Sequence, residues 1–477
     1  MEPSAPNKPP YEILEAENAT LRQQVAELAA KLEAALAEIE RLKRSGKRQA
    51  APFSKGTRKA DPQRPGRKPG AGPFRYRTAP PPAVSGPPVA VPVTDPHCPT
   101  CGGGLEAAGE ETVWITDLPE RVQPETRAFQ VQTCRCTRCG RSVRGEHPEL
   151  APDQRGATAH RLGPRAWAMA HLLHYGVGLP VRRVPEVLRL LTGLPLTQGA
   201  LTQDALRRAA GKVGEAYRAL RESVTTAPAV HTDDTGWRVG GRHAWLMGFE
   251  TATASVYQVR RRHRNEEVRE VIPGDYQGVL CSDRGKSYDA RELDGVRQQK
   301  CLAHLQRNLS EVLERKRGRG RWFAGKLKRL LGAGLELWHR YHADEWAHDP
   351  EGFTRVRAVV VQQVDWHLRD RRLRDLDHQR LLDELGWHHD RGNLLRFLFE
   401  PDTVEPTNNR AERGLRPAVI ARKVSQCSKN ERGAEAFGAF TSVIRTVLRR
   451  SPADPVAALV EVFRTGLLPE PLPAKTR

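Results

Sequence analysis

The chain begins with apolar residues at a heptad spacing. Asn18 shares one of the two seam sets, where a buried amide favours a parallel dimer because it pairs best with the same residue of the other helix. A seam of this length predicts a coiled coil over residues 11–44. The alternative is a single amphipathic helix that lies on the rest of the protein. The first set consists of Leu14, Leu21, Leu28, Ala35 and Leu42, and the second contains Val25, Leu32 and Ile39.

Residues 45–92 carry no such pattern. They are rich in Pro, Gly, Arg and Lys and have too few apolar side chains to offset the entropy of ordering, which predicts a flexible basic linker. Within it, Arg67 and Lys68 belong to an Arg-Pro-Gly-Arg-Lys-Pro-Gly segment that suits an extended arm in a DNA minor groove. A solvated tether explains the same composition equally well.

Helical spacing of apolar residues returns over residues 156–220. Helices are predicted at 162–175, 181–191 and 199–210, with a break at Gly193-Leu194-Pro195. Short helices around such a turn, carrying basic residues such as Arg182 and Arg183, suit a helix-turn-helix-like DNA-binding region. A helical bundle without DNA contacts is the alternative.

The apolar period changes after residue 227. Strands are predicted at 230–239, 243–249, 255–259 and 278–282, with a helix at 265–271 between the last two. Helical patterns then continue almost to the end, with breaks near Pro401 and Pro417. The whole chain is therefore predicted to be a multidomain α/β protein whose sheet lies within residues 227–470.

Composition changes this picture only through the net charge of the chain, which indicates a class of ligand. The chain has 477 residues, with 77 Lys and Arg against 57 Asp and Glu, which gives a formal net charge of +20. Such a charge attracts polyanions, of which nucleic acid is the commonest. No apolar run approaches the ~18 residues of a membrane span, and the polar start is unlike a signal peptide. We therefore expect a cytoplasmic protein that binds nucleic acid and no membrane.

Two Cys-x-x-Cys-Gly motifs predict a zinc ribbon-like domain over residues 93–150. Cys98 and Cys101 form one motif and Cys136 and Cys139 form the other. Together they supply the four thiolates that a tetrahedral structural Zn²⁺ site requires, with no open position for catalysis. Redox pairs are the competing interpretation, and Cys134 is a spare thiol that could substitute in one motif.

Three acids have the setting of metal ligands for phosphoryl transfer on DNA, which needs hard divalent cations held by carboxylates. Asp233 lies on the first predicted strand and Asp283 ends the fourth, where an acid faces the site crevice of an open sheet. Glu412 lies in a polar stripe of a helix that is predicted to begin at Thr407 and to stop at Pro417. Taken singly, each acid is equally explained as a capping or surface carboxylate.

Four segments resemble the catalytic signatures of the insertion sequence 66 family of transposases. The order of modules is similar too, because that family has a zipper-like start, a basic linker, a zinc-binding domain, a helical DNA-binding region and an RNase H-like core. The similarity extends over nearly the whole chain. The segments are His231-Thr232-Asp233-Asp234-Thr235-Gly236-Trp237, Leu280-Cys281-Ser282-Asp283, Cys301-Leu302-Ala303-His304 and Asn408-Asn409-Arg410-Ala411-Glu412-Arg413-Gly414-Leu415-Arg416-Pro417.

The resemblance implies the catalytic acids of a DDE enzyme. Asp233, Asp283 and Glu412 would bind Mg²⁺ (or Mn²⁺). Asp234 stands where the family more often has Glu, and we assign the ligand role to Asp233. The family's Cys-x-x-His corresponds to Cys301 and His304, which share a helix face and for which structural support beside the site is the simpler role.

Basic residues and a long interval surround these signatures. Residues 315–400 exceed what a bare RNase H-like core needs, and we interpret them as a helical insertion that grips DNA or positions Glu412. A solvated basic face would explain the nearby cations almost as well as DNA contacts. The cations proposed to hold phosphates are Arg413, Arg416, Arg422 and Lys423.

The resemblance implies a DNA transposase that cuts the ends of an insertion sequence, after which the freed 3′-hydroxyl attacks target phosphate in line. Its expected partners are terminal inverted repeats, target DNA, further copies of the chain in a homodimer or higher assembly, and accessory proteins of the same element. We expect it at the bacterial nucleoid. The alternatives are an inactive zinc-containing DNA-binding protein and a metal-dependent nuclease without strand transfer.

Overall fold

The computed structural model of the protein describes most of the chain beyond residue 162 and shorter parts before it. The described residues are 15–16, 18–29, 32–33, 89–106, 122–147, 162–369, 372–425, 427–450 and 452–471. The chain divides into two compact units, Met1–Ile115 and Thr116–Arg477, and each is considered by itself. Arg67 and Lys68 of the predicted basic arm lie outside the described residues.

In the first unit, residues 18–29 are helical, as the heptad pattern predicts. The seam residues within the described part are exposed in the single chain: Leu21 by 58%, Val25 by 65% and Leu28 by 64%. An unburied apolar stripe is what one helix of a coiled coil shows without its partner. The coiled coil itself stays a prediction, and its other seam positions Leu14, Ala35, Ile39 and Leu42 lie outside the described residues.

The second unit begins with a short hairpin. Strands β1 (Thr133–Arg135) and β2 (Ser142–Arg144) pair antiparallel, so the Cys136–Cys139 turn connects them. The helices that follow are α2 (Pro164–His171), which continues into the π-helix η3 (Leu172–Gly176), then α3 (Val184–Thr192), α4 (Gln198–Ala210) and α5 (Lys212–Thr225). The turn from α3 to α4 begins at Gly193, whose φ of +72° is a left-handed conformation that glycine adopts without strain.

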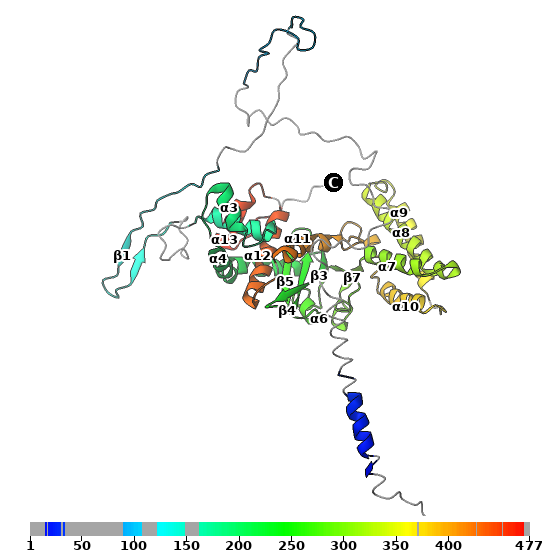
Figure 1. The fold of residues 1–477 in the computed structure, drawn as a ribbon. Coiled ribbons are helices and arrows are strands. Elements are labelled where there is room, and N and C mark those ends of the chain that lie inside the picture. Colours follow the sequence, from blue (N-terminus) through cyan, green and yellow to red (C-terminus); the bar gives the residue numbers. More distant parts are fainter. Residues whose placement is uncertain are drawn as a thin grey trace, which may run out of the picture. The chain divides into compact units, whose positions relative to one another are not determined.

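A five-stranded mixed sheet forms the centre of this unit (Figure 1). Its order is β5-β4-β3-β6-β7, in which β3 pairs antiparallel with β4 and parallel with β6. The predicted α/β class is therefore confirmed. The strands are β3 (Ala229–Val239), β4 (Arg242–Glu250), β5 (Ser255–Arg260), β6 (Val279–Ser282) and β7 (Arg297–Lys300), with helix α6 (Asn265–Arg269) after β5.

Helices from the end of the chain cover this sheet. Helix α11 (Asn409–Ser425) packs on β3 and β4, and α12 (Glu431–Arg449) packs on β5. Helix α13 (Pro455–Thr465) packs on α2 and α5. The helical region and the sheet therefore share one apolar core, which includes Val213, Leu220, Phe249 and Phe440.

Residues between β7 and α11 fold as a second group of helices. They are α7 (Leu302–Arg315), η5 (Gly318–Arg321), α8 (Trp322–His342), α9 (Pro350–Leu368), α10 (Leu376–Asp390) and η6 (Arg396–Leu398). They lie beside β7, whereas α3, α4 and α13 lie toward the other edge of the sheet (Figure 1). Val279 and Cys281 of β6 are buried in the core of this helical group, which fixes its base to the sheet.

The predicted limits of α11 were wrong at both ends. The helix begins at Asn409 rather than at Thr407, and it continues through Pro417 to Ser425. Proline removes one backbone hydrogen bond from a helix. Leu415 and Ala418 on either side of it are 3% and 4% exposed, so the packing of α11 on the sheet outweighs the lost bond. No helix in the described part of the chain is both long and apolar enough to cross a membrane.

Candidate active site

The two adjacent acids of β3 lie where the sheet opens. Strand β6 pairs with β3 only as far as His231, so Asp233 and Asp234 extend past the parallel pairing. On the other side, Asp233 pairs with Gly248 of β4. A Cβ added at Gly248 would lie 3.1 Å from Leu415 of α11. Because paired residues of an antiparallel ladder point to the same face, Asp233 faces α11.

Asp234 points to the opposite face of the sheet, since successive residues of a strand alternate. Its Oδ1 lies 3.3 Å from Nδ1 of His263, and Nε2 of that histidine lies 3.3 Å from the Ser287 hydroxyl. Burial lowers the pKa of His263. Asp234 thus has a side-chain partner of its own, which favours Asp233 as the acid directed at Glu412.

Asp283 follows the last residue of β6. Strands β3 and β6 are parallel and pair His231 with Cys281, so the same register continued past the end of β6 places Asp283 beside Asp233. The Asp283 Oδ1 accepts a hydrogen bond from the Gly285 amide at 2.9 Å, which fixes the turn after the strand. This arrangement brings Asp283 to the same edge as Asp233.

Glu412 is placed by the start of α11. The Glu412 amide donates to the Asn408 carbonyl at 3.2 Å, so Asn408 is the N-cap residue. Asn408 is 1% exposed, its side-chain amide donates to the Thr232 carbonyl at 2.7 Å, and its backbone amide donates to Cys301 Sγ at 3.1 Å. The first turn of the helix is therefore tied both to β3 and to the start of α7.

A second contact holds α11 two residues after Glu412. The Tyr257 hydroxyl lies 2.6 Å from a carboxylate oxygen of Glu250 and 2.8 Å from the Gly414 carbonyl oxygen. Glu250 is fully buried and pairs with Arg449 of α12. Gly414 has no side chain to meet this buried carboxylate, which lets α11 approach the sheet closely.

The acids line a cavity of about 330 Å³ between β3 and α11. Asp283 is not among its lining residues. Strand β3 contributes two carboxylates to the wall of the cavity, and helix α11 contributes the carboxylate of Glu412 and two cations. Its lining is Asp233, Asp234, Thr235, Glu412, Leu415, Arg416, Val419, Ile420 and Lys423.

The acids of this edge affect one another electrostatically. Burial raises the pKa of Asp233 to about 7, and the negative charges of Asp234, Asp283 and Glu412 contribute to the rise. Burial also raises the pKa of Asp234 to about 7, with a contribution from Asp283. Partly buried carboxylates that repel one another are an environment that a bound cation would stabilise.

Carboxylate oxygens are the ligands that Mg²⁺ and Mn²⁺ prefer, so the donor set fits these metals. In the described residues, however, no three Asp, Glu, His or Cys side chains already surround one point in a way that would hold a metal ion. Glu412 is 39% exposed and has room to change its rotamer. Binding of a metal would therefore require side-chain movement at this site.

Cys301 and His304 lie beside Glu412. Cys301 is the N-cap of α7, and His304 Nε2 lies 3.8 Å from a carboxylate oxygen of Glu412. Burial opposes ionisation of the thiol, but hydrogen bonding with His304 and the Asn408 amide outweighs it and lowers the pKa of Cys301. The same thiol raises the pKa of His304. Structural support for Glu412 remains the prediction for this pair.

Sequence reasoning missed a buried lysine at this edge. Lys300 ends β7, is 0% exposed, and lies 2.7 Å from Asp289 Oδ1 and 3.4 Å from the Ser282 hydroxyl. Burial lowers its pKa. The strand reads Arg-Gln-Gln-Lys, so no apolar pattern identified it. Asn408 belongs to one of the four signature segments, but its burial could not be read from the sequence.

The predicted DNA-binding cations divide into two kinds. Arg416 and Lys423 line the cavity, and Arg413 is exposed on the same helix. Arg422 is half-buried and donates to the Thr235 hydroxyl at 2.9 Å and to the Gly236 carbonyl, so it fastens α11 to β3. In the helical region, Arg182 is exposed before α3. Its neighbour Arg183 pairs with Glu186 at 2.5 Å.

Each cysteine motif forms a tight turn. The Gly102 amide donates to the Cys98 carbonyl at 2.8 Å, and the Gly140 amide donates to the Cys136 carbonyl at 2.9 Å. The two glycines have φ of +74° and +70°, which a side chain would strain. Hydrogen bonds from the backbone of the following residues lower the pKa of Cys98 and of Cys136. Such turns favour the thiolate form that binds metals.

The mixed sheet, with an acid within β3, an acid directly after β6 and an acid on a covering helix, is consistent with a DDE-type core. Residues 160–436 match a family model described as "Transposase IS66 family". The match covers more than half of the chain, and the chain belongs to the IS66 family of transposases. Membership implies a role in transposition and DNA binding.

The chain is also similar to a protein of Sinorhizobium fredii described as "Uncharacterized protein y4hP". The two are 24% identical over 402 residues, which is 77% of this chain and 70% of that protein. The similarity therefore extends well beyond the acids and their immediate surroundings.

Proposed function

We propose that this chain catalyses metal-dependent DNA cleavage and strand transfer at the ends of an insertion sequence. The observation that carries the proposal is the cavity between β3 and α11, which Asp233 and Glu412 line together with Arg416 and Lys423. Acids and cations that share one cavity suit a phosphodiester, whose charge needs cations and whose cleavage needs carboxylate-held metal ions.

Asp233, Asp283 and Glu412 would hold the Mg²⁺ (or Mn²⁺). When bound, such metal ions activate the attacking oxygen and stabilise the charge on the leaving oxygen. The raised pKa of Asp233 supports this assignment, because a group destabilised by burial and like charges gains most from a cation. Asp234 would stay outside the ligand set through its contact with His263.

The chain's other residues position the reacting groups. Arg416 and Lys423 would bind phosphate oxygens at the cavity wall, and Asn408 holds the turn that presents Glu412. In cleavage, water adds to phosphorus as the bond to the 3′-oxygen breaks, which leaves a 3′-hydroxyl. In strand transfer, that hydroxyl attacks a target phosphate, a new phosphodiester forms and the target's own 3′-oxygen leaves.

The test compares single amide substitutions in a cleavage assay with Mg²⁺ and labelled DNA that carries the element's inverted repeat. Asp233→Asn, Asp283→Asn and Glu412→Gln should abolish strand cleavage and leave end binding intact. Asp275→Asn is the matched control, because Asp275 is an exposed aspartate in the loop before β6. Unimpaired cleavage by Asp283→Asn would contradict the assignment of that acid.

The same assay separates strand transfer from its alternatives. Joined products support a transposase, cleaved ends without joining indicate a nuclease, and binding alone indicates a DNA-binding protein without activity. Asp234→Asn decides between the adjacent acids. It should retain cleavage, whereas loss equal to that of Asp233→Asn would show that both carboxylates are needed.

We also infer a structural zinc ion bound by Cys98, Cys101, Cys136 and Cys139. The turn geometry of each motif and the lowered thiol pKa values of Cys98 and Cys136 support thiolate ligands. Metal analysis of the purified chain should find one zinc per chain, and a chain without zinc would contradict the inference.

A further inference from the structure

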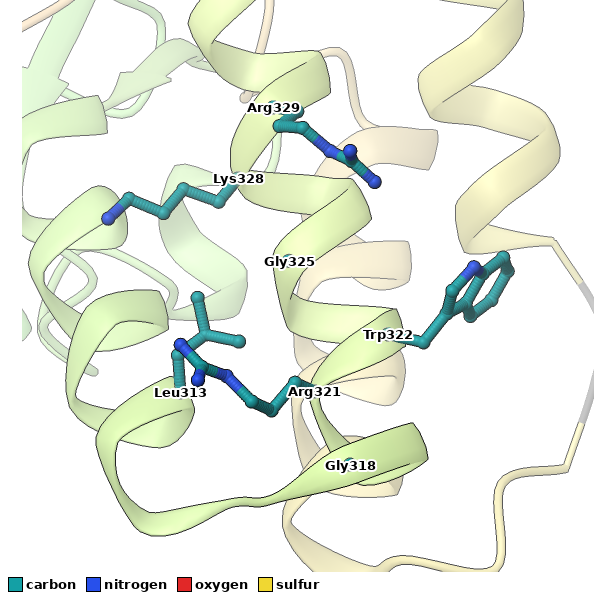
Figure 2. Close-up of a pocket in the computed structure, with 7 residues that line it drawn as sticks. All are labelled: Leu313, Gly318, Arg321, Trp322, Gly325, Lys328 and Arg329. Carbon is teal, nitrogen blue, oxygen red and sulfur yellow. The ribbon is translucent and has the colours of Figure 1, made fainter.

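A second hollow lies on α8, in the helical group between β7 and α11. Its volume is about 960 Å³, against about 330 Å³ for the cavity at the acids. Figure 2 shows the residues that surround it, which lie on the end of α7, on η5 and on the first turns of α8. It is lined by Leu313, Gly318, Arg321, Trp322, Gly325, Lys328 and Arg329.

The charge of this hollow is entirely positive. Arg321, Lys328 and Arg329 are its charged lining residues, and none of the lining residues is acidic. Arg321 and Arg329 are exposed and have no ion pair within the described residues. Lys328 donates to the Ser310 hydroxyl of α7 at 2.8 Å, which holds its ammonium group at the wall.

Some other cations of the same helical group are paired with acids. Lys316 lies 2.7 Å from Asp375 and 2.8 Å from Asp377. Arg340 pairs with Glu345 at 2.7 Å. At the hollow, no acidic lining residue offsets the charge of the three cations, so a polyanion would be attracted rather than repelled.

The floor of the hollow is bare backbone. Gly318 opens η5 with a left-handed φ of +54°, Gly325 lies on α8, and both line the hollow. A Cβ at Gly318 would meet nothing within 4 Å, and one at Gly325 would meet only Leu313, at 3.7 Å. In Figure 2, Arg321 and Lys328 extend toward α7, and Trp322 and Arg329 extend to the opposite side. The bare strip is thus flanked by cations on both sides.

The spacing of the cations favours an extended ligand. Arg321 and Lys328 are seven positions apart, or about 10 Å at the 1.5 Å per residue of a helix. A single small anion would not contact cations on both sides of the helix and at both ends of this strip. Trp322, which stacks edge-on against His367 at 5.3 Å, is 56% exposed beside them. Cations with an adjacent aromatic ring are typical of surfaces that bind a nucleic acid backbone.

We propose that this hollow on α8 is a second DNA-binding site, which contacts the phosphates of DNA outside the cavity at the acids. Arg321, Lys328 and Arg329 bind phosphate oxygens, and the glycines let the backbone of the DNA approach the helix. This proposal rests on the proposed function in one respect, which is that DNA is the substrate. It does not depend on the chemistry of cleavage.

The first test measures DNA affinity without divalent metal, so that catalysis plays no part. The double variant Arg321→Ala/Arg329→Ala is compared with wild type by fluorescence anisotropy, using a labelled duplex of about 30 bp over a range of salt concentrations. If two phosphate contacts are lost, the slope of log K against log salt should become less steep by about 2. The affinity at about 0.1 M salt should fall by as much as about 60-fold, since each contact contributes about 0.9 to the slope.

The control is the pair Arg340→Ala/Arg355→Ala. It removes the same charge from the same helical group, but Arg340 pairs with Glu345 and Arg355 lies within 3.7 Å of Asp349 and Glu351. The control should bind as wild type does. An equal loss in both pairs, or wild-type binding by Arg321→Ala/Arg329→Ala, would overturn the proposal.

A second comparison uses one position and does not remove any cation. Gly325→Ala adds a Cβ at an ordinary contact distance and favours the helix, so it should fold and bind normally. Gly325→Glu places a carboxylate in the hollow and should weaken binding. Wild-type affinity of Gly325→Glu would contradict the site. Measuring both Gly325 variants with a single strand of the same sequence shows whether the hollow prefers duplex or single-stranded DNA. If Gly325→Glu loses affinity for neither form of DNA, the site is contradicted.

These outcomes are separable from failure of the proposed function. If wild type binds DNA but never cleaves it, the catalytic proposal fails while the hollow can still be tested by affinity. If the hollow variants bind DNA normally and Asp283→Asn still abolishes cleavage, the hollow is excluded as a DNA-binding site and the catalytic proposal stands.

Discussion

Replacement of Asn408 by alanine should separate the positioning of Glu412 from the stability of the fold. Asn408 is buried, and its side-chain amide donates to the Thr232 carbonyl of β3 at 2.7 Å. A hydrogen bond of this kind contributes about 1 kcal/mol net, and leaving a buried carbonyl without a partner costs about 1–3 kcal/mol. Asn408→Ala should therefore lower the free energy of unfolding by about 1–3 kcal/mol. Domains are commonly stable by about 5–15 kcal/mol, so the variant should remain folded.

The effect on catalysis should be larger than the effect on folding. The lost bond ties the first turn of α11 to the strand that carries Asp233, and Glu412 lies in that turn. A displacement of about 1 Å can slow catalysis by about 10²-fold. We expect single-turnover cleavage of labelled end DNA to slow by about 10- to 100-fold at an unchanged DNA affinity.

Asn409→Ala is the matched control. Asn409 is the next residue and the same amide, but it is exposed, so its loss should change stability by no more than about 0.5 kcal/mol and leave cleavage as in wild type. Urea unfolding gives the stability of each variant and cleavage gives its rate. The reasoning fails if Asn408→Ala cleaves as fast as Asn409→Ala, or if its rate falls only in proportion to its folded fraction.

Three other predictions concern the contacts that hold the fold. Gly414→Ala should destabilise the chain by about 1–3 kcal/mol and slow cleavage, because the new Cβ would overlap with the buried carboxylate of Glu250. Asp204 has its pKa lowered to about 2 because the hydrogen bond from His171 and the charge of nearby arginine outweigh burial. Its stabilisation of about 2 kcal/mol relative to Asp204→Asn should be full above about pH 4 and should disappear as pH falls toward 2, which urea unfolding at each pH would measure. Cys136→Ser should lower the zinc content found by metal analysis, and an unchanged content would exclude this ligand.

The sheet could be predicted where burial leaves an apolar pattern. The segments predicted at 230–239, 243–249 and 255–259 match β3, β4 and β5 to within a residue or two, because most of their buried positions are apolar. Strand β7 could not be predicted, since its buried side chains are Gln298, Gln299 and Lys300. Each of them is buried with a polar partner: Gln298 donates to the Tyr288 carbonyl, and Lys300 lies 2.7 Å from Asp289. Such pairing depends on residues far along the chain and leaves no local pattern.

The candidate active site also has features that could be predicted from the sequence and features that could not. Asp233 and Glu412 were identified from their sequence context and lie in one cavity. The sequence offered no physical reason to choose Asp233 over Asp234, and the structure supplies one, because alternation along β3 turns Asp234 toward His263. The predicted stop at Pro417 was wrong, since a local rule for proline takes no account of the buried Leu415 and Ala418 on either side.

The helical group between β7 and α11 explains how acids so far apart in sequence can meet. Its two ends are joined at the base: the Leu302 amide donates to the Pro406 carbonyl at 3.0 Å, and the Asn408 amide donates to Cys301 Sγ at 3.1 Å. The chain therefore leaves the sheet and returns to it at nearly the same point. Glu412 follows directly after the contacts that join the two ends of the helical group. Its position therefore depends on those contacts and on β3, and not on the helices between the two ends. Those helices are free to carry a DNA-binding surface such as the hollow on α8 without displacing the acid.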